Sequence, residues 1–422
     1  MRSLYTLALA AALPFILLRL WWRGRRERGY RENIGERLGK YRAQPGDKII
    51  WIHAVSVGEA RAAAPLVRAL ERALPDHQLL LTCMTAAGRA TLKEVYGESV
   101  LAAYLPYDYP GAVRGFLEHF WPRLGLLMET ELWPNLLAAC AEHGVPVLLA
   151  NARMSEKSAR RYARWAALTE PAWRSLAAAC AQSAADAERL RALGAPRVEV
   201  TGNLKFDVLP SAQQVAAGRA WRARLGRPVL LLASTREGEE KLLLGEISRS
   251  ESKGADPLIV VVPRHPQRFD EVAQWADARR SRTEIPDETQ KIYLGDSMGE
   301  MAFYYAASDV ALIGGSFVPL GGQNLIEALA VGTPVVAGPG MFNFSEATRL
   351  AVEAGAALQA PDAPSGVRLA LELLLDPQKR RQMSAAGMKL CEAHRGATER
   401  HLQACLRIMG SEQISGNPPV GR

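Results

Sequence analysis

GDSMGEMAFYYAASDVALIGGSFVPLGGQNLIEALAVGTPVVA, residues 295–337, is the stretch of sequence that decides the fold. Its hydrophobic periodicity predicts a helix over 298–307, a strand over 310–313, a second helix over 324–331 and a strand over 334–337. Four glycines lie between the first strand and the second helix: Gly314, Gly315, Gly321 and Gly322. They would let a ligand approach the backbone closely, and the start of the next helix would offer N–H groups to an anion.

Glu327 lies one turn into the second of these helices. A carboxylate accepts hydrogen bonds from ribose hydroxyls, so this stretch could hold both the phosphate and the sugar of a nucleotide. The alternative is that the glycines form ordinary turns and that Glu327 complements the helix dipole. The stretch therefore predicts a nucleotide site, with the turn interpretation still open.

Strands alternate with helices on both sides of this stretch, and 422 residues suffice for two domains. The first series of strands is expected at 48–55, 79–83, 100–104, 124–128, 145–150, 177–181 and 198–201. The second series is expected at 229–233, 258–262, 291–294, 310–313, 334–337 and near Ala357. This alternation predicts an α/β fold of two doubly wound, Rossmann-like parallel sheets, facing each other across a cleft at the carboxyl ends of their strands.

The expected division of the chain follows from these runs. The limits are 1–42 for a membrane anchor and basic segment, 43–208 for the first domain, 209–228 for a connection, 229–385 for the second domain, 386–409 for helices that could pack back on the first domain, and 410–422 for a disordered tail.

The N-terminal sequence predicts a membrane-anchor helix. Residues 3–18 carry no charge and reach about 24 Å as a helix, against ~30 Å for a hydrocarbon core. Between Arg19 and Arg42, nine basic and three acidic residues carry +6 of the net +8, which favours anionic lipid headgroups over nucleic acid. This bias predicts that the domains stay on the cytoplasmic side. Spanning the bilayer and lying in one leaflet both remain open, since Pro14 and the short length count against a clean span.

The five cysteines are widely spaced and lie in apolar runs. This pattern predicts reduced core residues in a cytoplasmic protein. No His, Cys or Asp cluster has metal-ligand spacing, so we expect no metal site and no cofactor. Neither GxGxxG nor GxxxxGK[ST] occurs, which disfavours an NAD-dependent or ATP-hydrolysing enzyme.

Charged residues follow several strands of the first series. Glu59 comes after the first strand, where a general base would stand, although a helix-capping role fits its position equally well. Glu129 and Glu131 directly follow a buried strand. Lys205 could offset charge on a leaving phosphate.

In the second series, one strand ends in Pro263, Arg264 and His265. An arginine suits phosphate because its guanidinium makes two parallel hydrogen bonds. His265 lies between two prolines that fix its loop, which favours a positioned role.

Taken together, these motifs resemble one family, the 3-deoxy-D-manno-octulosonic acid (Kdo) transferases. The matching segments are HAVSVGE (53–59), METELWPN (128–135), NAR (151–153), GNLKFD (202–207), PRHP (263–266), MGE (298–300), GGS (314–316), NLIE (324–327) and the basic N-terminal segment with YRENIGERLG (30–39). The resemblance covers nearly the whole chain. One departure is Arg236 in STREGEE, where the family pattern has histidine.

The resemblance implies a GT-B glycosyltransferase that inverts configuration, with CMP-Kdo as donor and the tetraacylated, bisphosphorylated lipid A precursor (lipid IVA) as acceptor. It implies that Glu59 is the base and that Glu129 and Lys205 stabilise the transition state. The residues implied to hold CMP are Pro263, Arg264, Met298, Gly299, Glu300, Asn324, Leu325, Ile326 and Glu327, with His265, Gly315, Ser316 and Glu131 as additional candidates.

Two alternatives stay open at this point. One is another membrane-associated GT-B transferase that uses a UDP-sugar and a polyprenyl-linked acceptor. The other is a membrane-tethered nucleotide-binding module without turnover, against which Glu59 argues. The number of Kdo residues transferred and the oligomeric state are not encoded in any of these motifs.

Overall fold

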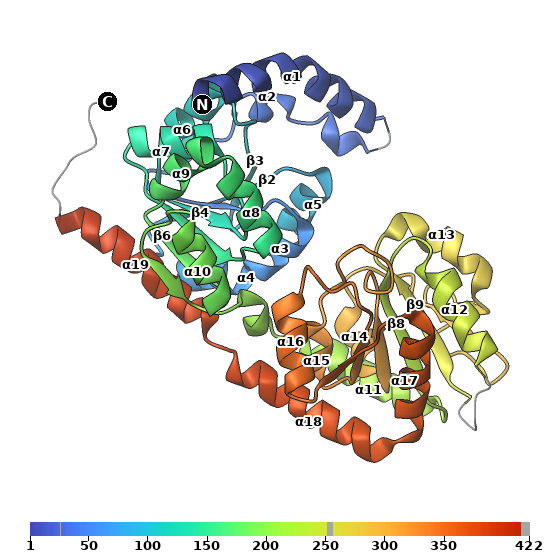
Figure 1. The fold of residues 1–422 in the computed structure, drawn as a ribbon. Helices are drawn as coiled ribbons and strands as arrows, with labels where there is room; N and C mark the ends of the chain where they lie inside the picture. The colour runs from blue at the N-terminus through green and yellow to red at the C-terminus, as the bar shows by residue number, and fades with distance from the viewer. Residues whose placement is uncertain (26, 251–255, 415–422) are drawn as a thin grey trace. The chain divides into compact units, whose positions relative to one another are not determined.

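The computed structural model describes residues 1–25, 27–250 and 256–414 (Figure 1). The chain forms two compact units, one made of residues 1–207 with the segment from Arg395, the other of residues 208–394. Each unit contains a seven-stranded parallel sheet, which confirms the predicted α/β class.

The first unit has the strand order β3-β2-β1-β4-β5-β6-β7. Its strands are β1 (Ile49–His53), β2 (Gln78–Cys83), β3 (Leu101–Tyr104), β4 (Pro122–Met128), β5 (Val147–Ala152), β6 (Ala178–Ala181) and β7 (Val198–Val200). Its helices are α1 (Arg2–Arg23), α2 (Ile34–Arg37), α3 (Val57–Ala62), α4 (Ala64–Ala73), α5 (Ala86–Tyr96), α6 (Pro110–Phe120), α7 (Pro134–Glu142), α8 (Glu156–Arg164), α9 (Ala166–Arg174), α10 (Ala184–Ala192) and α19 (Ala397–Ile414), with 3-10 turns η1 (Arg28–Tyr30) and η2 (Leu204–Asp207).

The second unit has the order β10-β11-β9-β8-β12-β13-β14. Its strands are β8 (Val229–Thr235), β9 (Leu258–Pro263), β10 (Ala278–Arg279), β11 (Ile292–Leu294), β12 (Val310–Ile313), β13 (Val335–Ala337) and β14 (Ala357–Gln359). Its helices are α11 (Ala212–Arg224), α12 (Glu239–Arg249), α13 (Phe269–Val272), α14 (Met301–Ala306), α15 (Ile326–Val331), α16 (Ser345–Glu353), α17 (Ala363–Leu375) and α18 (Pro377–Ala393).

Strand β1 shows why the sequences of these strands are continuously apolar. All five of its residues are buried, and it pairs in parallel with β2 and β4. Ile50 and Ile52 pack into one hydrophobic cluster, whereas Ile49 and Trp51 pack into another. Successive side chains therefore enter cores on opposite faces of the sheet, so that helices must cover both faces.

The structure differs from the sequence-based expectation in three places. The two-residue strand β10 was not predicted, because two residues give no periodic signal. Residues 212–224, expected within a connection, form α11, which packs on α14 inside the second unit. In the C-terminal region α18 belongs to the second unit and α19 to the first, and α19 continues to Ile414, beyond the expected start of the tail. The rest of that tail, 415–422, lies outside the described residues.

Two features bear on the cellular setting. Helix α1 is long and apolar enough to cross a membrane, by length and composition, and only 6% of its most apolar window is buried. All five cysteines are buried and none is in a disulfide.

Candidate active site

The first candidate cluster lies at the carboxyl edge of the first sheet. Glu59 follows β1, Glu129 follows β4, and Lys205 lies in η2 just after β7. Strands β1 and β4 are neighbours, so the turns that carry the two glutamates are adjacent. This is the edge at which parallel α/β sheets bind ligands.

The carboxylate of Glu59 is fixed by the turn that begins α3. Ser56 caps the helix: its Oγ accepts a hydrogen bond from the Glu59 N–H and donates one to Glu59 Oε1 at 2.9 Å. The Val55 N–H donates to Glu59 Oε2 at 2.9 Å. Glu59 is therefore a capping residue with a fixed orientation, and the capping role does not exclude a role as base.

Glu59 also has a pKa suited to proton transfer near neutrality. Burial raises its pKa to about 7, and the charge of Glu129 adds to the rise, whereas the hydrogen bonds from Ser56 and Val55 oppose it. A general base works best when its pKa lies near the working pH.

Glu129 forms an ion pair with Lys205. The distance from Lys205 Nζ to Glu129 Oε1 is 2.7 Å, and the two side chains are 15% and 17% exposed, respectively. Burial alone would raise the pKa of Glu129, but Lys205 and Arg153 outweigh it, so that the pKa is lowered. Two neighbouring carboxyl groups thus have opposite shifts, which is the usual signature of divided roles in an active site.

The backbone at Glu129 adopts an uncommon conformation. Its φ is +59°, in the left-handed region that non-glycine residues rarely occupy, and its N–H donates to the Ala150 carbonyl. Such residues cluster at functional sites, because surrounding contacts must hold them there. Glu131, two residues on, accepts a hydrogen bond from Trp133 Nε1 at 2.8 Å, and burial raises its pKa.

Helix α19 returns to the first unit and holds the loop that carries Lys205. The carboxylate of Asp207 accepts hydrogen bonds from the N–H groups of Gly396 and Thr398. Arg400 Nε donates to the Thr201 carbonyl at 2.8 Å. These contacts, at Thr201 and at Asp207, hold the segment that contains the η2 turn against the start of α19.

His401 extends this connection to β5. The Asn151 N–H donates to His401 Nε2 at 2.9 Å, which leaves Nδ1 as the protonated nitrogen, 2.7 Å from the Ala397 carbonyl. Asn151 Oδ1 in turn accepts the Leu204 N–H at 3.0 Å. Burial lowers the pKa of His401 to about 4, so this neutral tautomer persists at neutral pH. Sequence reasoning missed His401 and Arg400. No local sequence pattern indicates that these helix residues contact Asn151 and Thr201, which lie 250 and 199 positions earlier in the chain.

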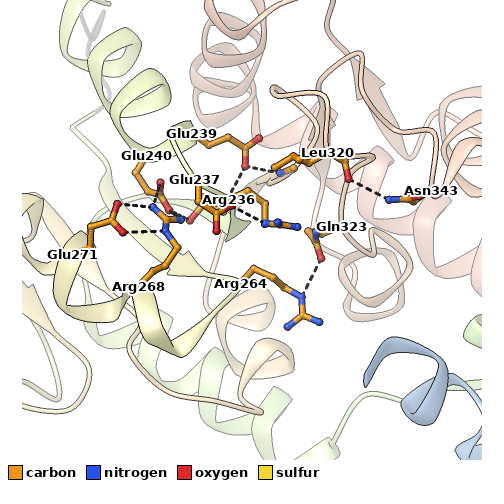
Figure 2. Close-up of polar contacts among 12 residues, drawn as sticks. Arg236, Glu237, Glu239, Glu240, Arg264, Arg268, Glu271, Leu320, Gln323 and Asn343 are labelled. Atoms are coloured by element: carbon orange, nitrogen blue, oxygen red, sulfur yellow. Dashed lines mark hydrogen bonds and ion pairs between the residues drawn. The ribbon is translucent and has the colours of Figure 1, made fainter. Parts of the chain in front are cut away.

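The second candidate site is built around the glycine-rich loop of the second unit. Buried Glu239 accepts hydrogen bonds from three backbone N–H groups, those of Arg236, Gly315 and Phe317. Figure 2 shows Glu239 beside Arg236. A Cβ at Gly314 would lie 2.4 Å from the Ser234 carbonyl oxygen, so this position requires glycine. The loop therefore folds around a carboxylate that the chain supplies.

A buried ion pair involves Glu240, the residue that follows Glu239 in α12. Arg268 makes two hydrogen bonds to Glu240, at 2.7 and 2.9 Å, and also reaches Glu271 (Figure 2). Thr235, at the end of β8, donates to Glu240 Oε1 at 2.6 Å. The STREGEE segment thus serves mainly to build the edge of the sheet.

Arg264 links the end of β9 to the glycine-rich loop. Its N–H donates to the Thr235 carbonyl, and its Nε lies 3.2 Å from Gln323 Oε1 (Figure 2). Pro263 is the last residue of β9. Half-buried His265 has a lowered pKa, first through burial and then through the charges of Arg236 and Arg264.

The remaining donor-site candidates lie at the same edge. Glu300 pairs with Arg280 at 3.4 Å, and the Gly299 carbonyl accepts from Gln214 Nε2 at 2.9 Å, while Met298 is 53% exposed. These residues follow β11, whereas 324–327 follow β12.

The segment 324–327 is ordered by its own side chains. Asn324 Nδ2 donates to Glu327 Oε1 at 3.0 Å, and Asn324 Oδ1 accepts the Ile326 N–H. Leu325 is buried and precedes α15. These contacts fix the carboxylate of Glu327 beside the loop.

Two of the additional candidates have internal partners. The Gly315 N–H is bound to Glu239, and buried Ser316 donates to the Ile313 carbonyl and accepts from the Gly338 N–H. Both residues shape the loop, since the Gly315 carbonyl also accepts the Gly322 N–H and the Ser316 carbonyl accepts the Gly340 N–H. Within the described ranges, no group of three or more His, Cys, Asp or Glu side chains is arranged to hold a metal ion.

Comparisons with known proteins identify the family of the chain. A family model described as 3-Deoxy-D-manno-octulosonic-acid transferase (kdotransferase) matches residues 32–208, and one described as Glycosyl transferases group 1 matches residues 278–390. A solved UDP-GlcNAc 2-epimerase from Neisseria meningitidis covers 85% of this chain and 100% of its own, with a TM-score of 0.58 at 15% identity. That likeness concerns the two-domain α/β fold alone.

Relatives of known family span nearly the whole chain. A 3-deoxy-D-manno-octulosonic acid transferase of Bordetella pertussis is 48% identical over 96% of this chain and 98% of its own length. One of Haemophilus influenzae is 36% identical, over 95% and 97% of the two lengths. The chain therefore belongs to the 3-deoxy-D-manno-octulosonic acid (Kdo) transferase family and is a glycosyltransferase that transfers Kdo in lipopolysaccharide biosynthesis.

Proposed function

We propose that this enzyme transfers Kdo from CMP-Kdo to a hydroxyl of the tetraacylated, bisphosphorylated lipid A precursor, with inversion at the anomeric carbon. The observation that carries this proposal is the cluster at the carboxyl edge of the first sheet, where Glu59 has a pKa of about 7 beside the Glu129–Lys205 ion pair. A base and a fixed cation are the two groups that a single displacement needs.

In this mechanism Glu59 accepts the proton of the acceptor hydroxyl while that oxygen attacks the anomeric carbon of Kdo. The bond from this carbon to the phosphate oxygen of CMP breaks, and its electrons leave with CMP. Lys205 offsets negative charge in the transition state, and Glu129 holds Lys205 in place at 2.7 Å. One displacement inverts the configuration.

The second unit would hold CMP. Arg264 provides a guanidinium at a strand end for the single phosphate. Glu327, fixed by Asn324, provides a carboxylate for ribose hydroxyls. Pro263, Leu325, Ile326 and residues 298–300 complete the proposed donor site.

The acceptor is a membrane lipid, so the enzyme should work at the cytoplasmic face of the inner membrane. In the structure α1 lies against the first unit, because Tyr5 donates to Asp108 at 3.0 Å and Thr6 to Asn135 at 3.1 Å. Its opposite side exposes large apolar residues: Leu4, Leu7, Phe15, Leu18, Trp21 and Trp22. A helix bonded along one side and apolar on the other suits the plane of one leaflet, and this arrangement is the anchor that we propose.

Mass spectrometry and NMR test the proposal together. The full-length protein is incubated with the lipid acceptor and either CMP-Kdo or UDP-sugars. We expect a mass increase only with CMP-Kdo, the size of which counts the transfers, and NMR of the product should show the inverted anomer. Transfer from a UDP-sugar, or retention of configuration, would contradict the proposal.

A further inference from the structure

Arg37 is a buried cation for which the described residues provide no ion-pair partner. We infer that its guanidinium is the centre of a binding site for a phosphate group of the lipid acceptor. This inference deepens the proposed function and rests on it for the identity of the lipid. The argument that an anion binds there rests on the surroundings of Arg37 alone.

The guanidinium of Arg37 is held in one orientation. The residue is 1% exposed, its Nη1 donates to the Met84 carbonyl at 3.0 Å, and its Cζ lies 3.9 Å from the centre of the Tyr104 ring. Its Nε and Nη2 are both buried and have no hydrogen-bond partner among the described residues. These two donors of the guanidinium fork thus have no partner with hydrogen-bond geometry, although the phenols of Tyr104 and Tyr107 lie close to the guanidinium.

The nearest carboxylate is already engaged. Glu36, the neighbour of Arg37 in α2, makes two hydrogen bonds with Arg89 and accepts the Tyr104 N–H at 2.8 Å. Among the described residues, no ion pair includes Arg37. A buried charge is costly unless it is paired, and stacking on one aromatic ring compensates only part of that cost. A ligand that supplied an anion would satisfy both the charge and the two free donors.

Further positive charge surrounds this position. Burial raises the pKa of the Tyr107 phenol, and the charges of Arg37, Arg19 and Arg23 oppose that rise, so all three cations act on this phenol. The Tyr107 N–H donates to the Arg37 carbonyl at 2.9 Å. Arg19 and Arg23 are exposed residues near the C-terminal end of α1. A phosphate that arrives from the side of the membrane helix would therefore meet cations before it reaches Arg37.

The position also matches the geometry of an acceptor. Met84 follows β2 and Tyr104 ends β3, and the sheet order β3-β2-β1 places these strand ends beside the end of β1, which Glu59 follows. Neighbouring strands are about 5 Å apart, so the strand ends that Arg37 contacts lie one to two strand spacings from the end of β1 along this edge. A hydroxyl and a phosphate on one sugar, or on adjacent sugars, are separated by a similar length.

A purely structural role is the competing explanation, in which ordered water satisfies the two donors. The two explanations differ in stability and in discrimination between acceptors. Since the guanidinium is 1% exposed, a phosphate can reach it only when a neighbouring side chain moves. Stacked, fork-shaped recognition also means that lysine cannot replace Arg37 fully.

The experiment compares Arg37→Met and Arg37→Lys with Arg174→Met, which removes an exposed arginine paired with Glu170 on the surface of the same unit. Kinetics are measured with the bisphosphorylated acceptor and with the same lipid after phosphatase treatment. We expect Arg37→Met to raise KM for the phosphorylated acceptor by about 10- to 100-fold, the usual effect of losing hydrogen bonds to a charged group. KM for CMP-Kdo and for the dephosphorylated lipid should not change, Arg37→Lys should be intermediate, and Arg174→Met should match wild type. Equal losses with both lipids would overturn the inference.

A binding measurement that needs no turnover accompanies the kinetics. With saturating CMP present, millimolar inorganic phosphate should raise the Tm of wild type and of Arg174→Met, but not that of Arg37→Met. The unliganded Arg37→Met protein should have an unchanged or higher Tm, because an unpaired buried charge is gone; a large fall would show a structural role and overturn the inference. If phosphate stabilises the protein through Arg37 but no lipid accepts Kdo, the anion site stands and the acceptor assignment fails. If Kdo transfer occurs but its preference for phosphorylated lipid is independent of Arg37, the proposed function stands and this inference fails. Anionic vesicles without acceptor should not reproduce the Arg37-dependent shift.

Discussion

Lys205 Nζ lies 2.7 Å from Glu129 Oε1, although 76 positions separate the two residues in the chain. The pair joins the turn after β4 to the turn after β7, and it holds the pKa of Glu129 down against burial. It therefore keeps one carboxylate ionised beside Glu59, whose pKa is raised.

Lys205→Met should lower kcat by about 100- to 1000-fold, the range found when one preorganised electrostatic group is removed from an active site. It should also lower the free energy of unfolding by about 2 kcal/mol, because Glu129 loses its charged partner. The double variant Glu129→Gln/Lys205→Met should recover most of this stability but no activity. Recovery of activity in the double variant would show that the pair is only structural.

The activity should depend on the ionisation of Glu59. Because the base must be deprotonated, kcat/KM should rise with pH below about 7 and level off above it. The rise should be absent from the residual activity of Glu59→Gln. A profile that is flat between pH 5.5 and 8.5 would exclude Glu59 as the base.

The stability of the protein should also depend on the ionisation of Glu59, but it should fall as pH rises, whereas the activity should rise. The folded chain holds the Glu59 proton up to about pH 7, whereas the unfolded chain releases it near the ordinary glutamate pKa of 4.5. Between these values the folded state binds more protons, so the Glu59 contribution to stability falls as pH rises. We therefore compare the Tm of Glu59→Gln with that of wild type by calorimetry. The Tm difference should favour the variant more at pH 8 than at pH 5. An unchanged difference between the two pH values would contradict the raised pKa.

His401→Phe tests whether α19 positions Lys205. The Asn151 N–H would lose its acceptor, so we expect a loss of about 1–3 kcal/mol in unfolding free energy. Displacement of the Lys205 turn should lower kcat roughly tenfold or more, with KM for CMP-Kdo little changed. His119→Phe is the matched control: His119 bonds the Ala43 carbonyl from α6, close to where β4 begins and so away from the carboxyl edge. Equal effects of the two substitutions on kcat would count against a positioning role.

The depressed pKa of His401 adds a pH signature. The unfolded chain binds a proton at this histidine below about 6.5, whereas the folded chain excludes it down to about 4. The associated stability is fully present above pH 6.5 and is lost as pH falls towards 4. Wild type should thus lose more stability than His401→Phe between pH 6.5 and 4.5.

Glu239→Ala should disrupt the donor site without touching the first unit. Three N–H groups that now bind one buried carboxylate would be left without it, at about 1–3 kcal/mol for each group that stays unpaired. We expect CMP binding by calorimetry to weaken at least tenfold, and the lipid acceptor to bind as before. Glu237→Gln, whose side chain is 58% exposed, is the control and should bind CMP like wild type. Normal CMP binding by Glu239→Ala would show that the loop does not need this carboxylate.

The sequence was most informative where a local residue pattern determines the structure, as in buried strands and glycine turns. Thirteen predicted strand positions all correspond to strands, because apolar runs such as 49–53 must be buried on both faces of a parallel sheet. Turn chemistry was also readable: the positive φ of Gly315, Gly321 and Gly322 fits the glycine-rich stretch at which a nucleotide site was predicted. Strand β10 was missed because it is too short. The helical character of 212–224 was recognised, but its packing within the second unit was not, because the helix is polar.

Long-range partners could not be predicted. No local pattern indicates that His401 accepts the Asn151 N–H or that Glu239 binds the loop after β12. Nor does one indicate that two buried donors of Arg37 have no hydrogen-bond partner in the described part of the chain. The capping and catalytic interpretations of Glu59 looked like alternatives in the sequence. In the structure the same Ser56 contacts that cap α3 also orient the carboxylate, so the two interpretations are compatible.

The most direct test of the account is Kdo transfer by Glu59→Gln compared with wild type, followed by mass spectrometry of the lipid under single-turnover conditions with CMP binding measured in parallel. We predict that the variant binds CMP normally and transfers Kdo at least about 100-fold more slowly, because it lacks the group that accepts the hydroxyl proton. Transfer within a few-fold of wild type would contradict the assignment of Glu59 as the base and with it the proposed site at this edge of the sheet.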